Sequence, residues 1–113
     1  MNKNLKMVRG DTLSFGIDYS FDDETTQDLD TCYFSCKQNA DDEEYIFQKS
    51  LNDGISKVDD GQYRVRVAPE DTEDVEVGNY YYDLEIGLNN DIFTIIKGVL
   101  SIESDITRWK NEY

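Results

Sequence analysis

The chain has 113 residues, of which 38% are hydrophobic and 32% are charged. This length and apolar content fit one folded domain with its own core and exclude an intrinsically disordered chain. The 11 Lys and Arg against 25 Asp and Glu give a net charge of −14, which opposes binding to nucleic acid and to anionic membranes. Such a surface either limits self-association by solvation or docks a basic partner.

Apolar side chains recur at every second position through most of the chain, which is the pattern of strands with one buried face. In chain order, the predicted inward rows are Leu5 and Met7; Leu13, Phe15, Ile17 and Tyr19; Cys32, Phe34 and Cys36; Tyr45 and Phe47; Tyr63, Val65 and Val67; Tyr80, Tyr82, Leu84, Ile86 and Leu88; and a last strand from Phe93 to Ile102. Six to eight short strands of this kind predict an all-β fold, an antiparallel β-sandwich over residues 1–105. Residues 106–113 lack strand alternation and form a C-terminal tail.

Turns separate these strands. Arg9-Gly10-Asp11 resembles the tripeptide that integrins read, but a Gly between charged residues at the end of a strand predicts a turn. Asn89-Asn90-Asp91 predicts a short hairpin turn, and Gly98 suggests a bend or bulge in the last strand.

A polar loop from Ala68 to Gly78 leads into the long alternating strand from Asn79 to Leu88. Residues 70–75 suit one helical turn that starts at Pro69 or Glu70. A polar loop, a Gly turn and a Tyr at the start of a long strand are typical of the crossing between the two sheets of a Greek-key sandwich. We expect Tyr80 to be buried, with its hydroxyl bonded to the backbone of the loop.

The two cysteines, Cys32 and Cys36, lie four residues apart on one predicted strand. At roughly 3.3 Å per residue their Cα atoms are about 13 Å apart on the same face, whereas a disulfide needs about 7 Å or less. The sequence therefore predicts free, buried thiols, as in a protein made in a reducing cytoplasm. A zinc site would need two further ligands, and the chain has no His.

The chain offers few combinations of residues that could catalyse a reaction. Without His, the Ser-His-Asp and Cys-His arrangements are excluded. Acidic residues are so frequent that chance pairs are expected, and no pair is placed as a glycosidase site requires. We therefore predict no enzyme, no catalytic residue, no cofactor and no metal, although acidic clusters such as Asp41-Asp42-Glu43-Glu44 leave a weak cation site in a loop as an alternative.

Four aromatic residues are candidates for an interface. Alternation places Tyr81 and Tyr33 on outward faces, where Tyr either pairs across strands or anchors a partner. Trp109 and Tyr113 belong to the tail, which either packs back over the sandwich or anchors on a neighbouring subunit together with Ile106. No secretory leader and no apolar run of membrane-spanning length is visible in the sequence.

Several short segments resemble a known group of proteins. They are Met7-Val8-Arg9-Gly10-Asp11-Thr12-Leu13-Ser14-Phe15, Gly61-Gln62-Tyr63-Arg64-Val65-Arg66-Val67, Gly78-Asn79-Tyr80-Tyr81-Tyr82-Asp83-Leu84 and Phe93-Thr94-Ile95. Together they resemble the immunoglobulin-like β-sandwich proteins of the tail, baseplate and neck of phages of Gram-positive bacteria, in particular the N-terminal domain of upper baseplate proteins. The resemblance implies a non-enzymatic virion protein, made in the cytoplasm of the bacterial host, that forms homo- or hetero-oligomers with other virion proteins.

Two other functions remain open at this point. A carbohydrate- or receptor-binding module would use Tyr33, Tyr81 or Trp109 as a stacking platform. An acidic inhibitor of a host enzyme would suit the net charge of −14, but it needs acids spaced along one face, and the acids here cluster in predicted loops.

Overall fold

The computed structural model describes residues 2–19 and 28–107. In chain order the elements are β1 (Leu5–Val8), β2 (Leu13–Asp18), β3 (Thr31–Lys37), β4 (Phe47–Leu51), β5 (Gly54–Asp59), β6 (Gln62–Val67), the short 3₁₀ helix η1 (Pro69–Asp71), β7 (Gly78–Leu88) and β8 (Asp91–Glu103). Within the described residues the fold is therefore all-β, as predicted.

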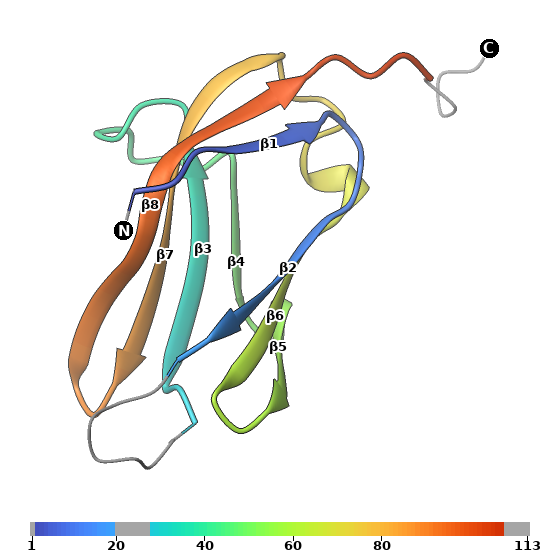
Figure 1. The fold of residues 1–113 in the computed structure, drawn as a ribbon. Coiled ribbons are helices and arrows are strands. Elements are labelled where there is room, and N and C mark those ends of the chain that lie inside the picture. Colours follow the sequence, from blue (N-terminus) through green and yellow to red (C-terminus); the bar gives the residue numbers. More distant parts are fainter. Residues whose placement is uncertain (1, 20–27, 108–113) are drawn as a thin grey trace.

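The strands are hydrogen-bonded in the order β1-β8-β7-β3-β4-β5-β6-β2, folded into two layers (Figure 1). One layer holds β1, β8, β7, β3 and β4, and the other holds β5, β6 and β2. The layers meet along one side, where β4 and β5 share two paired positions. Neighbouring strands are antiparallel except in the pairs β1–β8 and β4–β5. The runs β8-β7-β3 and β5-β6-β2 correspond to strands G-F-C and D-E-B of the two sheets of an immunoglobulin domain. The fold is an immunoglobulin-like β-sandwich.

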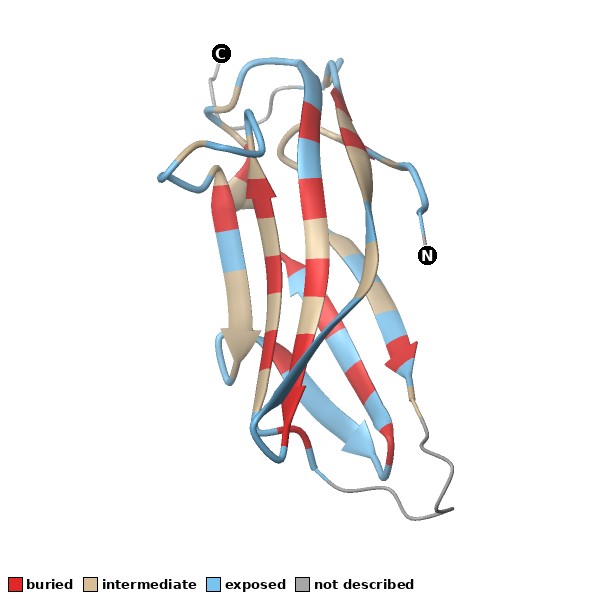
Figure 2. Cartoon of the chain, turned by 90° about the vertical axis from the view of Figure 1, so that its left-hand side faces the viewer, coloured by how far each residue is buried: buried red, intermediate tan, exposed pale blue. Residues whose placement is uncertain are grey.

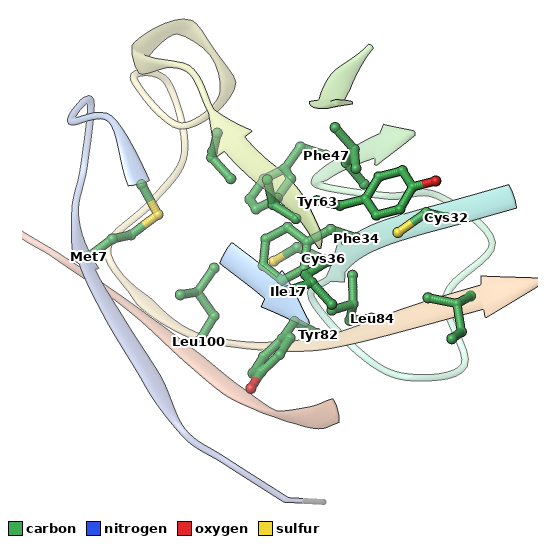
Figure 3. Close-up of a cluster of buried hydrophobic side chains, with 14 of the residues drawn as sticks. Met7, Ile17, Cys32, Phe34, Cys36, Phe47, Tyr63, Tyr82, Leu84 and Leu100 are labelled. Carbon is green, nitrogen blue, oxygen red and sulfur yellow. The ribbon is translucent and has the colours of Figure 1, made fainter. Parts of the chain in front are cut away.

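Buried and exposed residues alternate along the strands, and the buried ones fill the space between the layers (Figure 2). Phe34 lies at the centre, with its ring centroid 5.2 Å from that of Phe15, 5.8 Å from that of Phe47 and 5.6 Å from that of Tyr82. Figure 3 shows Phe47 and Tyr82 on opposite sides of Phe34. Antibody domains fill this region with a disulfide and a Trp. Here contacts between aromatic rings join the layers.

Cys32 and Cys36 are free and buried on β3, as predicted. Burial raises the pKa of the Cys32 thiol to about 11 and that of the Cys36 thiol to about 12. Because only a thiolate is a good nucleophile or metal ligand, both side chains act as small apolar groups of the core.

The loop between β6 and β7 is held by the interaction expected from the sequence. The hydroxyl of Tyr80 donates a hydrogen bond of 2.5 Å to the carbonyl oxygen of Glu76. η1 starts at Pro69, one of the two positions predicted, and the carboxylate of Asp71 accepts a hydrogen bond from the N–H of Ala68. The arrangement is the tyrosine corner of immunoglobulin-like folds.

The turn at Arg9-Gly10-Asp11 packs against this loop. The N–H of Gly10 donates to the hydroxyl of the fully buried Thr72 at 2.8 Å. The guanidinium of Arg9 contacts the carboxylate of Asp105 through two nitrogens, at 2.9 and 3.0 Å, and reaches the carbonyl oxygen of Val75 at 3.3 Å. The tripeptide is therefore a structural turn, as predicted, and its Arg is engaged within the fold.

Two strand assignments differ from the sequence analysis. The strand predicted at Tyr45 and Phe47 begins only at Phe47, and Tyr45 lies outside it with 47% of its surface exposed. β5 was not predicted, because Ile55 is its one buried residue and a single apolar side chain gives no alternation.

The turn before β8 is the one predicted, whereas the irregular position within β8 is not. The predicted hairpin is confirmed: Asn89 and Asn90 both have positive φ, 53° and 72°, as a two-residue type I′ turn requires. The predicted bulge at Gly98 is wrong, since the extra residue is Ile95. Gly98 instead makes room for the N-terminal segment, because a Cβ there would lie 2.2 Å from the carbonyl oxygen of Lys3.

Replacing Tyr80 by Phe removes the bond to the Glu76 carbonyl and keeps the ring in the core. We expect the free energy of unfolding to fall by about 1–2 kcal/mol, because a part-buried acceptor loses its partner. Urea denaturation measures this loss. The matched control is Tyr81→Phe on the same strand, which faces outward and should unfold like the wild type. Equal stability of Tyr80→Phe and the wild type would contradict the role of the corner.

Candidate functional site

The outer face of the layer formed by β8, β7, β3 and β4 carries both of the described residues that the sequence analysis chose as interface candidates. Strand pairing aligns Tyr33 with Glu85 and Lys37 with Tyr81, while Ser35 lies opposite Asp83 between them. The two tyrosines therefore lie on one face, four residues apart along the paired strands, with the Ser35–Asp83 pair between them.

On the other side of β7, Asp83 pairs with Lys97 of β8, and Tyr81 pairs with Val99. Three adjacent strands thus present a grid centred on Asp83, which we call the Asp83 face. Its members are Tyr33, Ser35 and Lys37 on β3, Tyr81, Asp83 and Glu85 on β7, and Lys97 and Val99 on β8.

The Asp83 face is hollowed. A depression of about 850 Å³ is lined by side chains that include Tyr33, Tyr81, Asp83 and Lys97. Half of the surface of Tyr81 is exposed (50%). At one side, the Nζ of Lys37 lies 5.0 Å from the centre of the Tyr45 ring. This volume is within the range of small-ligand sites.

Asp83 is a partly desolvated charge of this face. Burial raises the pKa of its carboxyl group, and the nearby Lys37 and Lys97 offset part of that rise. Within residues 2–19 and 28–107, the side chain of Asp83 forms no salt bridge and no hydrogen bond. The neighbouring Ser35 is bonded, since the side-chain amide of Gln48 donates a hydrogen bond of 3.0 Å to its hydroxyl. The depression therefore contains a partly desolvated carboxylate with room for a donor or a cation.

The other two interface candidates, Trp109 and Tyr113, lie outside the described residues. Ile106, which the sequence analysis grouped with them, is 97% exposed. The sequence analysis missed Asp83, Lys37 and Lys97. Alternation places all three outward, but only the strand pairing brings them together.

The acidic loops gather no metal-ligand group in the described part of the chain. Between β3 and β4, the carboxylate of Asp42 accepts a hydrogen bond of 3.1 Å from the N–H of Asn39, which closes a turn. The residues described also include no helix of the length and apolar character needed to cross a membrane.

No protein-family model and no curated protein sequence matches this chain. Among solved structures, the extracellular domain of the voltage-gated sodium channel beta4 subunit is similar, with a TM-score of 0.45 and 11% sequence identity over 93% of each chain. That protein forms parallel homodimers that explain its role in cell–cell adhesion. A likeness of this degree adds nothing to the fold assignment, which rests on the strand order and the tyrosine corner.

The desolvation of Asp83 predicts a pH-dependent effect of Asp83→Asn. Because its pKa is raised on folding, the ionised carboxylate disfavours the folded state at neutral pH. We expect Asp83→Asn to unfold at a higher urea concentration than the wild type at pH 7. The gain should vanish at a pH below the ordinary carboxyl range, where both states bind the proton.

Glu85→Gln is the matched control, since it removes one negative charge from the same strand and face. A gain of equal size in both variants would mean that the net charge, and not the desolvation of Asp83, causes the effect.

Proposed function

We propose that this protein is a non-enzymatic interaction module that serves as a structural or adaptor subunit of a phage particle, in its tail, baseplate or neck. The Asp83 face is its partner-binding surface. The observation that carries this proposal is that Tyr33 and Tyr81 line one depression around a carboxylate, Asp83, that forms no salt bridge and no hydrogen bond in the described part of the chain.

Tyrosines of this kind are good anchors, because each offers a large rigid ring with a polar tip. Tyr81 is half exposed in the unbound protein and has much surface left to bury. A donor or cation of the partner that reaches Asp83 compensates a charge that is already partly desolvated, so little further desolvation opposes binding.

The phage setting is supported by the sequence resemblance to baseplate and tail sandwiches. In that setting the protein is made in the host cytoplasm, and its partners are other virion proteins. Its net charge of −14 keeps free subunits apart until a specific contact forms.

The proposal is tested in the phage or prophage that carries the gene. Mass spectrometry of purified particles should detect the protein, and Tyr81→Ala should lower its amount per particle at least about tenfold, as expected for loss of one interface anchor. Val58→Ala is the control, since Val58 lies on β5 of the other layer and is 62% exposed. Particles that lack the wild-type protein would refute the proposal.

A carbohydrate is the second candidate ligand. The lining of the depression favours this candidate, because sugars stack on aromatic rings and form hydrogen bonds with polar groups. The rings are those of Tyr33 and Tyr81, and the polar groups are those of Ser35, Gln48 and Asp83. Binding of the wild-type protein to a glycan array, lost in both Tyr33→Ala and Tyr81→Ala, would support this candidate over a protein partner.

A further inference from the structure

We propose that the occupant of the depression in the Asp83 face is the C-terminal segment, residues 106–113, of a second copy of this chain. The inference rests on the proposed function and names the partner of the same surface.

The first argument is the composition of this segment. It holds two of the 11 basic residues of the chain, Arg108 and Lys110, and one of the 25 acidic residues, Glu112. The single Trp of the chain, Trp109, stands between the two basic residues. Ile106, Trp109 and Tyr113 supply apolar surface. A segment with a Trp between two cations is suited to a tyrosine-lined site that holds two carboxylates, Asp83 and Glu85, beside two lysines.

The second argument is the direction in which the chain leaves the sandwich. Asp105 is held by Arg9 at 2.9 Å, beyond the end of β8, and the next residue, Ile106, is 97% exposed. In Figure 1 residues 104–107, drawn in red beyond the arrow of β8, run outward from the sandwich. Lys97 and Val99, which line the depression, lie further back along β8. Ile106, the first residue of the segment, is therefore accessible to a neighbouring molecule.

The third argument is the match between the segment and the depression. Eight residues reach at most about 26–29 Å, which is more than the roughly 13 Å along the strands between the positions of Tyr33 and Tyr81. An indole suits the space beside the half-exposed Tyr81, where rings gain from stacking and edge contacts. Arg108 and Lys110, the cations on either side of Trp109, are suited to Asp83 and Glu85, the two carboxylates of the face.

Such a contact joins two different surfaces, the face of one copy and the tail of the next. Contacts of this kind build rings when the rotation between copies closes and open chains when it does not. This property distinguishes the proposal from a two-fold contact between two Asp83 faces, and it defines the test.

The test uses two full-length variants, each with one half of the contact intact. Tyr81→Ala keeps the tail and impairs the face, and Trp109→Ala keeps the face and impairs the tail. Size-exclusion chromatography with light scattering should show concentration-dependent oligomers for the wild type. Each variant by itself should dissociate at a concentration at least about tenfold higher. An equimolar mixture should recover a dimer through its one intact contact, and Val58→Ala should match the wild type.

Two outcomes would overturn the inference. One is a mixture that associates no better than its two components. The other is a wild-type protein that stays monomeric at all concentrations. That result would overturn the inference even if the emission of Trp109 reported a buried indole, because the indole would then be buried within its own copy. Because Trp109 is the single Trp of the chain, a blue shift that grows with concentration reports docking between copies directly.

These results are separable from the test of the proposed function. If particles contain the protein and need Tyr81, but purified copies do not associate, the face binds another virion protein and this inference fails while the function stands. If copies associate but no particle contains them, the assembly stands and the phage setting fails.

Discussion

The hydrogen bond from the Tyr80 hydroxyl to the Glu76 carbonyl fixes the start of the strand on which the rest of the molecule depends. β7 is central in its layer, paired with β3 on one side and with β8 on the other. A slip of one residue in a strand exchanges its two faces. The corner places the ring of Tyr80 in the core. Because residues of a strand alternate between its faces, Tyr81 and Asp83 must then face outward. The fold and the candidate site therefore depend on the same hydrogen bond.

The distribution of charge gives the Asp83 face a different character from the whole chain. The chain carries −14, yet on this face Lys37 and Lys97 balance Asp83 and Glu85. Repulsion between distant surface charges is screened beyond about 10 Å at 0.1 M salt, whereas charges brought together in a contact are screened much less. The net charge therefore discourages random encounters, while a contact at this face meets a locally balanced surface.

The sequence predicted those features that depend on local patterns and left out those that depend on pairing. The buried rows of β2, β3, β6 and β7, the Tyr80 corner and the Asn89-Asn90 turn each follow from neighbouring residues. β5 has one buried residue and gave no periodicity. The placement of Tyr33 and Tyr81 around one depression depends on the β3–β7 register, and the bulge at Ile95 changes which side chains of β8 face inward along its length. No local pattern encodes either of these.

A partly desolvated carboxylate without a partner lowers the stability of the folded protein at neutral pH, as the raised pKa of Asp83 shows. A cation alone would recover that loss but would meet Lys37 and Lys97 on either side. A cation attached to an aromatic group gains more, because the ring can contact Tyr81 while the charge reaches Asp83. The face therefore selects for a mixed ligand, aromatic and cationic within a few residues. This criterion can be applied to any partner segment from its sequence, including the Arg108-Trp109-Lys110 run of this chain.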